Sequence, residues 1–183
     1  MSALELLDRE RLLAGLTATA RAGVSRLETH SVLDSTNHHL LVGARGGWPS
    51  GAVCLAEQQT AGRGRQGRRW LTPFGASLAC SLLWRFAGSL EALSGLSLAT
   101  GIAVARVLRK IGVSEAGLKW PNDVWWRQRK LGGILLESGG SAGDFYVVAG
   151  VGLNLALPRQ EAMAIDQPWV DLQEILRGKP ASR

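Results

Sequence analysis

The sequence predicts an α+β domain in which helices flank a mixed β-sheet. Three observations support this fold class. Apolar runs of strand length occupy much of the chain, one long stretch has helical periodicity, and the expected strands and helices do not alternate as in a βαβ protein. The 183 residues are enough for one domain with a substantial hydrophobic core.

The N-terminal region is expected to contain a helix, a short strand and a second helix. Leucines recur at helical spacing within residues 3–22, which predicts the first helix. We assign residues 1–29 to this helix and a linker. A short strand should end at Leu33, and Asp34 or Ser35 can cap the helix that follows, because their side-chain oxygens accept hydrogen bonds from free amide groups.

The rest of the chain is expected to form strands around one long helix. Short apolar runs predict strands at residues 52–58, 76–84, 117–120, 123–126, 130–138 and 145–155. Residues 89–111 carry the clearest apolar stripe at helical spacing, and Gly112 can end that helix. Residues 139–144 are typical of a hairpin connection, and the tail after Pro158 has room for one short helix.

The formal net charge of +6 at pH 7 is concentrated in one place. The sequence GRGRQGRRW at residues 62–70, which we call the arginine segment, contains Arg63, Arg65, Arg68 and Arg69. A protein that binds duplex DNA usually spreads its basic residues along a face or a helix. The observed concentration favours a small anionic ligand, and we do not expect this chain to bind DNA.

The glycines of the arginine segment also fit the dinucleotide-binding pattern G-x-G-x-x-G. That motif should open a helix and be followed about 20 residues later by an acidic residue. Here Pro73 and a predicted strand follow, and no aspartate or glutamate occurs between Glu57 and Glu91. A Walker loop is excluded because its G-K-[ST] ending is missing. A solvated surface loop and a phosphate- or carboxylate-binding loop both remain open.

Cysteine, histidine and targeting patterns indicate an ordinary cytoplasmic protein. Cys54 and Cys80 lie in apolar runs without a C-x-x-C zinc pattern, so reduced core thiols are expected. His38 and His39 are expected on a helix surface, and no activated-serine motif G-x-S-x-G is present. The N-terminus is too charged for a signal peptide. No apolar run approaches the roughly 20 residues that span a bilayer.

Six short motifs occur in a specific order along the chain. They are DSTN (34–37), EQQTAGRGRQGRRW (57–70), PFGASL (73–78), KWPND (119–123), RKLGGIL (129–135) and AGVGLN (149–154). Together they resemble the catalytic domain of biotin protein ligase, the biotin–[acetyl-CoA-carboxylase] ligase of bacteria, over roughly residues 30–175. The resemblance implies a fold like that of the class II aminoacyl-tRNA synthetases.

The resemblance also implies an ATP-dependent reaction. Biotin's carboxylate attacks the α-phosphate of ATP to give biotinyl-5′-AMP and pyrophosphate. A lysine of the biotin carboxyl carrier protein of acetyl-CoA carboxylase then takes the biotinyl group. Biotin and ATP are therefore the expected small molecules, with Mg²⁺ accompanying the phosphates. Because a carboxylate must approach a triphosphate, positioning and charge neutralisation should supply most of the acceleration.

The resemblance assigns site residues within these motifs. For biotin it implies Ser35, Thr36, Asn37, Gln59, Gly62, Arg63, Gly64, Arg65, Lys130, Gly133, Gly150 and Gly152. For ATP it implies Arg65, Arg68, Trp70, Asn122, Asp123, Lys130 and Asn154. Lys130 and Arg65 are the expected catalytic residues. Trp70 is expected to stack on adenine, and Asp123 is the expected Mg²⁺ ligand. From spacing alone, Lys130 would be an ordinary exposed lysine beside Arg127 and Arg129.

The chain differs from the family pattern at both ends. Some members begin with a winged helix-turn-helix domain that represses biotin genes, whereas only a short segment precedes the core here. Members also continue into another helix and a small C-terminal β-barrel, which the sequence ending at Arg183 lacks. We therefore expect residues 30–183 to form the catalytic domain without these parts. The resemblance leaves a homodimer open.

Three alternative functions remain open. Lipoate ligases share the general fold and chemistry, although the arginine segment and the KWPND motif favour biotin. A biotin-sensing transcription regulator would need a DNA-binding domain in a longer chain. A biotin-binding module without catalysis would bind biotin tightly and release no pyrophosphate.

Overall fold

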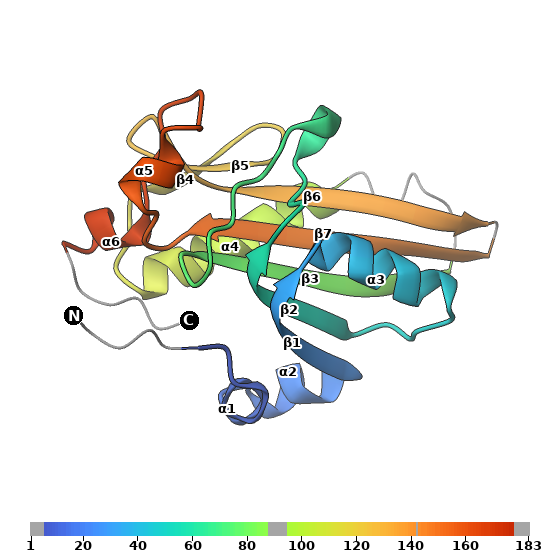
Figure 1. The fold of residues 1–183 in the computed structure, drawn as a ribbon. Coiled ribbons are helices and arrows are strands. Elements are labelled where there is room, and N and C mark those ends of the chain that lie inside the picture. The colour runs from blue at the N-terminus through green and yellow to red at the C-terminus, as the bar shows by residue number, and fades with distance from the viewer. Residues whose placement is uncertain (1–5, 88–94, 142, 178–183) are drawn as a thin grey trace.

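The computed structural model describes residues 6–87, 95–141 and 143–177, and its centre is a seven-stranded sheet (Figure 1). The sheet has the order β1-β2-β3-β7-β6-β5-β4. The strands are β1 (Arg26–Leu33), β2 (Ala52–Gln59), β3 (Ser77–Phe86), β4 (Ala116–Lys119), β5 (Asp123–Trp126), β6 (Arg129–Ser141) and β7 (Asp144–Asn154). β1 and β2 are parallel and every other neighbouring pair is antiparallel, so the mixed sheet of the predicted α+β class is confirmed.

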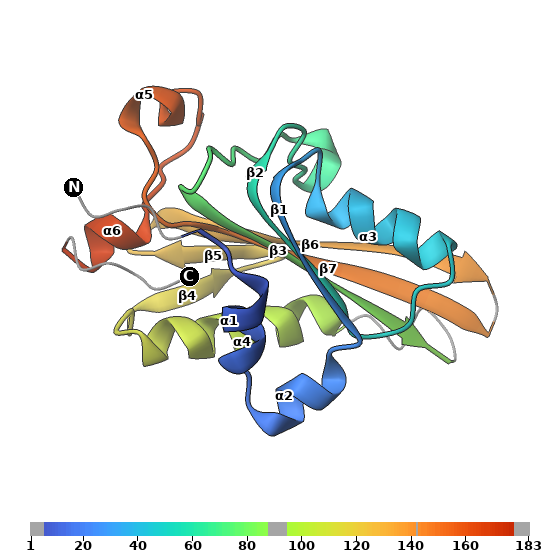
Figure 2. The same ribbon diagram turned by 60° about the horizontal axis from the view of Figure 1, so that its bottom comes forward.

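Helices cover both faces of this sheet. Within the described residues they are α1 (Arg9–Ala14), α2 (Ala18–Gly23), α3 (Thr36–Arg45), α4 (Leu96–Lys110), α5 (Arg159–Ala162) and α6 (Leu172–Ile175), with one 3₁₀ turn, η1 (Arg65–Gly67). Figure 2 shows α3 above the sheet and α4 below it. α3 packs on β2, β3 and β7, whereas α4 packs on β4, β5 and β6. None of these helices is both long and apolar enough to cross a membrane.

Each of the two longer helices closes a separate hydrophobic cluster. Under α3, Leu40 packs with Leu83, and both side chains are fully buried. Under α4, Leu108 packs with Val124 and Ile134. Burial of one leucine side chain stabilises a fold by about 2 kcal/mol. These clusters therefore hold the two helices on opposite faces and set the position of the first turn of α3.

The helix predicted for residues 3–22 is wrong, because the structure has two short helices there. Residues 1–5 lie outside the described part of the chain. Gly15 ends α1, and Thr17 caps α2 by accepting a hydrogen bond from the Ala20 amide. Neither helix contains a buried residue, so no core contact favours one longer helix over these local caps.

The first strand is longer than predicted. It runs parallel to β2, with Arg26 beside Ala52 at one end and Leu33 beside Gln59 at the other. The boundary expected after residue 29 therefore falls inside β1. Most residues at the start of β1 are polar, and such a strand is recognisable only from its pairing partner.

The remaining strand predictions are confirmed to within a few residues. β5 has the predicted bounds, and the β6–β7 hairpin is narrower than expected, since Ser141 pairs with Asp144. α4 begins at Leu96, and residues 89–94 of the predicted helix lie outside the described residues. The short helix expected in the tail is α6, whereas α5 was not predicted because its four residues give no periodic pattern.

Candidate active site

A cavity of about 430 Å³ opens on the sheet face that α3 covers. This volume lies within the range of about 300–1,000 Å³ that is typical of small-molecule sites. The first turn of α3, the arginine segment and the turn before β5 surround it. The predicted site residues that line it are Ser35, Thr36, Asn37, Gln59, Arg63, Gly64, Arg65, Arg68, Trp70, Asn122, Asp123, Lys130, Gly133, Gly150 and Gly152.

Two predicted site residues lie beside this cavity instead of in its wall. Gly62 lines a neighbouring hollow that is also formed by the arginine segment. Asn154 lines an adjoining cavity together with Trp70 and Lys130. The Asn154 Nδ2 group donates to the carbonyl oxygens of Lys130 at 3.5 Å and of Val170 at 3.0 Å. Asn154 therefore holds the backbone that carries Lys130.

The first turn of α3 forms one wall, and β2 holds its polar groups in place. Ser35 caps the helix, because its Oγ atom accepts a hydrogen bond from the His38 amide at 3.4 Å. Thr36 donates to Gln59 Oε1 from its amide at 2.9 Å and from its hydroxyl at 3.1 Å. Gln59 Nε2 in turn donates to Thr72 Oγ1 at 3.2 Å. The cap predicted at Ser35 is confirmed, and it places these side chains at the cavity.

Asn37 is held in the same wall by two strands. Its Nδ2 group donates to Glu137 Oε2 at 2.8 Å and to the Leu135 carbonyl at 3.3 Å, both on β6. Its Oδ1 atom accepts a hydrogen bond from the Ser81 hydroxyl on β3 at 2.6 Å. The Ser81 oxygen also lies 2.8 Å from Thr36 Oγ1, but its single proton serves one acceptor at a time.

Two glycines of β7 have no side chain, and the space above them is filled by other side chains of the site. A Cβ atom on Gly150 would overlap the Asn37 Oδ1 atom, and one on Gly152 would lie 2.6 Å from Trp70 Nε1. At Gly133 on β6, the nearest atoms would be in ordinary contact at 3.7 Å or beyond. The β7 glycines therefore make room for protein side chains, and their contact with the biotin ring stays a prediction.

The arginine segment forms a tight hairpin at the rim of the cavity. Arg63 and Arg69 form a β-bridge, and the Gly64 amide donates to the Arg68 carbonyl at 2.7 Å. Gly67 at the tip has a φ of 75°, a left-handed conformation that favours glycine. The segment leads into β3 and opens no helix, so the dinucleotide-binding interpretation is excluded.

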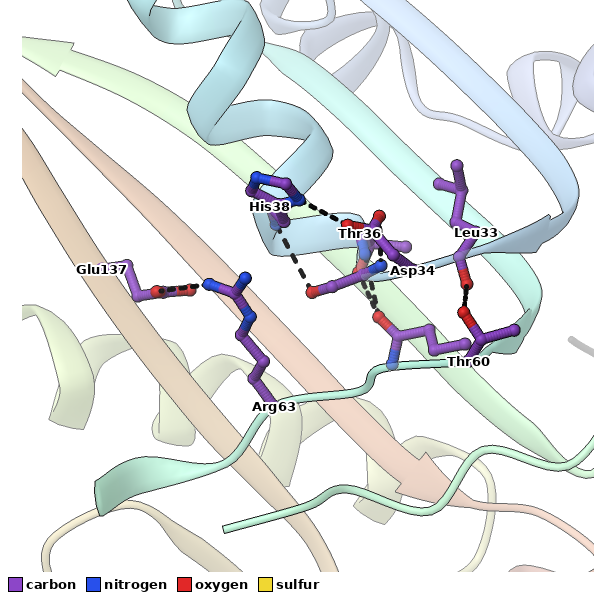
Figure 3. Close-up of polar contacts among 9 residues, drawn as sticks. Leu33, Asp34, Thr36, His38, Thr60, Arg63 and Glu137 are labelled. Carbon is purple, nitrogen blue, oxygen red and sulfur yellow. Dashed lines mark hydrogen bonds and ion pairs between the residues drawn. The ribbon is translucent and has the colours of Figure 1, made fainter. Parts of the chain in front are cut away.

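Two arginines of the segment each contact a residue outside it, Arg63 on β6 and Arg65 in the turn before β5. Arg63 Nη1 lies 3.8 Å from Glu137 Oε1, and Figure 3 shows this side chain reaching from the segment to β6. Arg65 Nη1 donates to Asn122 Oδ1 at 3.4 Å. Asn122 is itself fixed, because its Nδ2 group donates to the Ile134 carbonyl at 2.7 Å. These contacts hold the arginine segment across the cavity.

Asp34 adds a negative charge at this rim, beside the first turn of α3. Its carboxylate bonds to His38 Nδ1 and accepts the Ser35 amide at 2.6 Å (Figure 3). Burial acts to raise the pKa of Asp34, but the hydrogen bonds from His38 and Ser35 outweigh it, and the charge of Arg63 adds to the lowering. Asp34 is therefore ionised at neutral pH and attracts the arginine segment.

The Lys130 side chain lies in the same cavity as the arginines. Its Nζ atom is 2.9 Å from Asp123 Oδ1, and the side chain is only 14% exposed. This low exposure excludes the interpretation of Lys130 as an ordinary exposed lysine. The Nζ atom also lies 5.7 Å from the centroid of the Trp70 ring. The Lys130 amide donates to the Pro168 carbonyl at 2.9 Å, which anchors the start of β6.

Trp70 carries a polar group that suits a ligand. Its Nε1–H group is buried and has no hydrogen-bond partner among the described residues. An unpaired buried donor costs about 1–3 kcal/mol. A ligand that supplies an acceptor beside Gly152 would remove this cost, and the stacking of Trp70 on adenine stays a prediction.

Several residues of the site escaped the sequence analysis. Gln167 lines the cavity. Thr72, Ser81 and Glu137 do not line it, but they bond to the lining residues Gln59 and Asn37. Ser81 could have been found from one signal: it is a polar residue at an inward position of an apolar strand, where it needs a partner. Trp120 is 81% exposed and lies at the edge of the cavity.

Comparisons with known proteins agree with the order of these motifs. Residues 30–154 match the family model described as the Biotin/lipoate A/B protein ligase family. The chain is 49% identical over 144 residues to the Bifunctional ligase/repressor BirA of Escherichia coli, covering 78% of this chain and 44% of that protein. It is 40% identical over 157 residues to the Biotin--[acetyl-CoA-carboxylase] ligase of Mycobacterium tuberculosis, covering 83% of this chain and 58% of that protein. The chain thus spans about half the length of these relatives.

Solved structures show the same fold. The biotin protein ligase from Aquifex aeolicus in complex with biotin and ATP matches with a TM-score of 0.67 and 30% sequence identity. The match covers 87% of this chain and 64% of that chain. A class II aminoacyl-tRNA synthetase-like fold is therefore confirmed for the described residues.

Proposed function

The chain belongs to the biotin/lipoate A/B protein ligase family, and from this membership we propose that it is a biotin protein ligase. It joins biotin to AMP at the expense of ATP and transfers the biotinyl group to a lysine of the biotin carboxyl carrier protein of acetyl-CoA carboxylase. One observation carries this proposal: Lys130, the arginine segment and the polar first turn of α3 line a single cavity. A carboxylate that reacts with a triphosphate needs this combination of positive charge and hydrogen-bonding groups.

Biotin binds with its ureido ring against the first turn of α3 and its carboxylate towards Lys130. The polar groups of Thr36 and Asn37 suit the ureido group, which both donates and accepts hydrogen bonds. Both side chains are buried and held by Gln59 and Ser81, so little conformational entropy is lost on binding. This preorganised wall supports the assignment of biotin to this end of the cavity.

In the first step, a carboxylate oxygen of biotin attacks the α-phosphorus of ATP. A new P–O bond forms, the bond between the α- and β-phosphates breaks, and pyrophosphate leaves. Lys130 neutralises the approaching negative charges, which requires its Nζ atom to exchange Asp123 for the reacting oxygens. The 2.9 Å ion pair keeps the ammonium positioned at the cavity before the substrates arrive.

The arginine segment binds the phosphates from the other side. Arg65 and Arg68 line the cavity, and a planar guanidinium offers paired donors to phosphate oxygens. Arg63 would leave Glu137 for the ligand, because a 3.8 Å contact is a loose ion pair. Ligand binding is therefore expected to tighten the segment over the cavity.

Mg²⁺ accompanies ATP in this proposal. The residues that line the cavity suit an ion that the protein itself holds through few ligands. Asp123 is the one carboxylate among the described residues that line the cavity, and one of its oxygens pairs with Lys130. Mg²⁺ keeps several waters and commonly binds one or two carboxylates together with substrate phosphates. Asp123 would hold the ion, which when bound supplies further charge neutralisation to the phosphates.

In the second step, the neutral amine of the carrier lysine attacks the carbonyl carbon of biotinyl-5′-AMP. A C–N bond forms, the C–O bond to the phosphate breaks, AMP leaves and the amine proton passes to solvent. The exposed rim around Trp120 is where we expect the carrier lysine to enter.

We place the enzyme in the cytoplasm, because its two cysteines are free and lie on opposite faces of the sheet.

A direct assay tests the proposal. The 183-residue chain is incubated with biotin, MgATP and a carboxyl carrier domain, and the intact mass of the carrier is measured. The expected result is one added biotinyl group. Because the chain spans about half of its relatives, biotin-dependent ATP–pyrophosphate exchange is measured separately and reports the first step alone.

Lipoate serves as the competing acid in the exchange assay, since the family includes lipoate ligases. Exchange with lipoate and not with biotin would overturn the proposal. Tight biotin binding with no exchange would identify a binding module. A homodimer, which the resemblance left open, is tested by the molecular mass in solution with and without biotin and ATP.

A further inference from the structure

A second group of potential metal ligands lies between α3 and the strands β1 and β2, at one end of the sheet. His30, His39 and Cys54 each offer one ligand atom, and these atoms all lie within 4.8 Å of one another. Glu28 adjoins them, with its Oε2 atom 2.6 Å from His39 Nε2 and 3.4 Å from His30 Nε2. Of the described residues that line the candidate active site, none belongs to this group.

The sheet register explains why these side chains converge. Glu28 on β1 is the partner of Cys54 on β2, so both side chains project from the same face. His30 follows two residues after Glu28 and therefore shares that face. α3 covers this face, and His39 from its first two turns completes the group. Three elements thus each contribute at least one donor to the same point.

The donor set has the chemistry of a transition-metal site. Thiolate and imidazole ligands suit Zn²⁺ and similar divalent ions, whereas Mg²⁺ and Ca²⁺ prefer oxygen. Carboxylate oxygens also ligate Zn²⁺, and Glu28 is the carboxylate that lies beside both histidines. The side chains of His30 and His39 are 30% and 27% exposed, so an ion can reach them from solvent. Cys54 lies at the buried end.

Other roles for Cys54 fit the structure less well. Its side chain has no solvent exposure, and burial raises the pKa of its thiol, which argues against a reactive nucleophile. A disulfide with Cys80 is excluded by the register. Leu55 is the partner of Cys80, so the two cysteines project from opposite faces of the sheet.

We propose that this His–His–Cys group, with Glu28 as the fourth donor, binds one Zn²⁺-like divalent ion. Donors around tetrahedral Zn²⁺ lie roughly 3.3–3.8 Å apart, given bond lengths of about 2.0–2.3 Å. The ligand atoms of His30, His39 and Cys54, which lie within 4.8 Å of one another, must therefore close by up to about 1.5 Å, which rotation of the partly exposed imidazoles allows. On binding, the S–H bond of Cys54 breaks, the sulfur bonds to the metal and the proton passes to solvent.

The bound ion would tie α3 to β1 and β2. The first turn of this helix carries Ser35, Thr36 and Asn37, so the metal would stiffen one wall of the candidate active site without entering it. An ion that binds only the folded chain raises its resistance to unfolding. The inference stands independently of the proposed ligase activity.

Co²⁺ is the probe, because it occupies Zn²⁺ sites and reports its own ligands. Four-coordinate Co²⁺ has intense visible bands, and a bound thiolate adds a near-ultraviolet charge-transfer band. The reduced, metal-free chain is titrated with Co²⁺. We expect both bands to saturate at one equivalent per chain and to disappear when one equivalent of Zn²⁺ is added.

Matched variants locate the site. Cys54→Ser and His39→Gln should remove the charge-transfer band or weaken Co²⁺ binding at least about tenfold, as loss of a metal-site group does. Cys80→Ser and His38→Gln alter the other cysteine and the neighbouring histidine, and both should bind Co²⁺ like the unaltered chain. Circular dichroism checks that each variant is folded. His39→Gln keeps the test valid if the buried serine variant fails to fold, because His39 is partly exposed.

A second readout is thermal unfolding with one equivalent of Zn²⁺. The unfolding temperature of the unaltered chain should rise, and that of His39→Gln should not. The proposal is overturned if the unaltered chain shows no thiolate–Co²⁺ band, if the band survives in Cys54→Ser, or if Zn²⁺ shifts both unfolding temperatures equally.

Discussion

Replacing Gly150 with alanine tests whether the first turn of α3 depends on the space above β7. The added methyl group would overlap Asn37 Oδ1 and would lie 2.9 Å from Asn37 Cγ and 3.1 Å from Nδ2. Such distances are below ordinary van der Waals contact, so Asn37 must move. Its side chain is buried, with only 4% of the residue exposed, and has no solvent space to enter.

The cost follows from the contacts that Asn37 would lose. It bonds to Ser81, Leu135 and Glu137, and each hydrogen bond contributes about 1 kcal/mol net. Overpacking adds about 1–3 kcal/mol. Alanine also lowers the conformational entropy of the unfolded chain, which offsets the loss of stability by about 0.4–1 kcal/mol. With partial relaxation, we expect the free energy of unfolding to fall by about 2–4 kcal/mol.

Urea unfolding measures this change, and Gly117→Ala is the matched control. Gly117 is also a strand glycine, but a Cβ atom there meets no described atom within 4 Å. The control should change stability by no more than about 1 kcal/mol. Calorimetry on the folded Gly150→Ala protein should show biotin affinity reduced at least about tenfold, or about 1.4 kcal/mol. Equal stability of the two variants, with biotin affinity unchanged, would refute the reasoning.

Three further predictions concern charged residues. Lys130→Gln should leave the fold intact and lower biotin-dependent pyrophosphate exchange by about 10²-fold or more, since it removes charge stabilisation from the first step; near-normal exchange would contradict its role. Glu137→Gln should change stability by no more than about 1 kcal/mol but speed tryptic cleavage of the ligand-free arginine segment, because the ion pair with Arg63 is lost; equal cleavage rates would argue against that contact. Hydrogen bonding from Arg129 is the main cause that lowers the pKa of Glu174 from 4.5, against the opposing effect of burial. The ionised Glu174 side chain therefore stabilises the fold above pH 4.5, and this stabilisation is lost as the pH falls below 4.5 and the carboxylate becomes protonated. The unfolding temperature of Glu174→Gln should therefore be lower than that of the unaltered chain at neutral pH, and the gap should narrow as the pH falls below 4.5; a gap that does not depend on pH would disprove this contribution.

Local patterns were sufficient for most strands and for the identity of the motifs. Apolar runs located β5 and the β6–β7 hairpin, because a strand that is buried on one face or both must carry apolar side chains. The same reasoning failed for β1 and for the helices that precede it. Their residues contribute little to the core, so pairing and caps decide their conformation there.

The family and the chemistry of its motifs can be read from residue identity alone, because each motif is a short local pattern. Which side chains meet could not be read in this way. Asn37 reaches Ser81 and Glu137 only because α3 crosses β3, β7 and β6, which are neighbours in the sheet. The His–His–Cys group likewise exists only through the parallel register of β1 and β2. Strand order and register arise from hydrogen bonds between segments far apart in the chain, and no local pattern of residues encodes them.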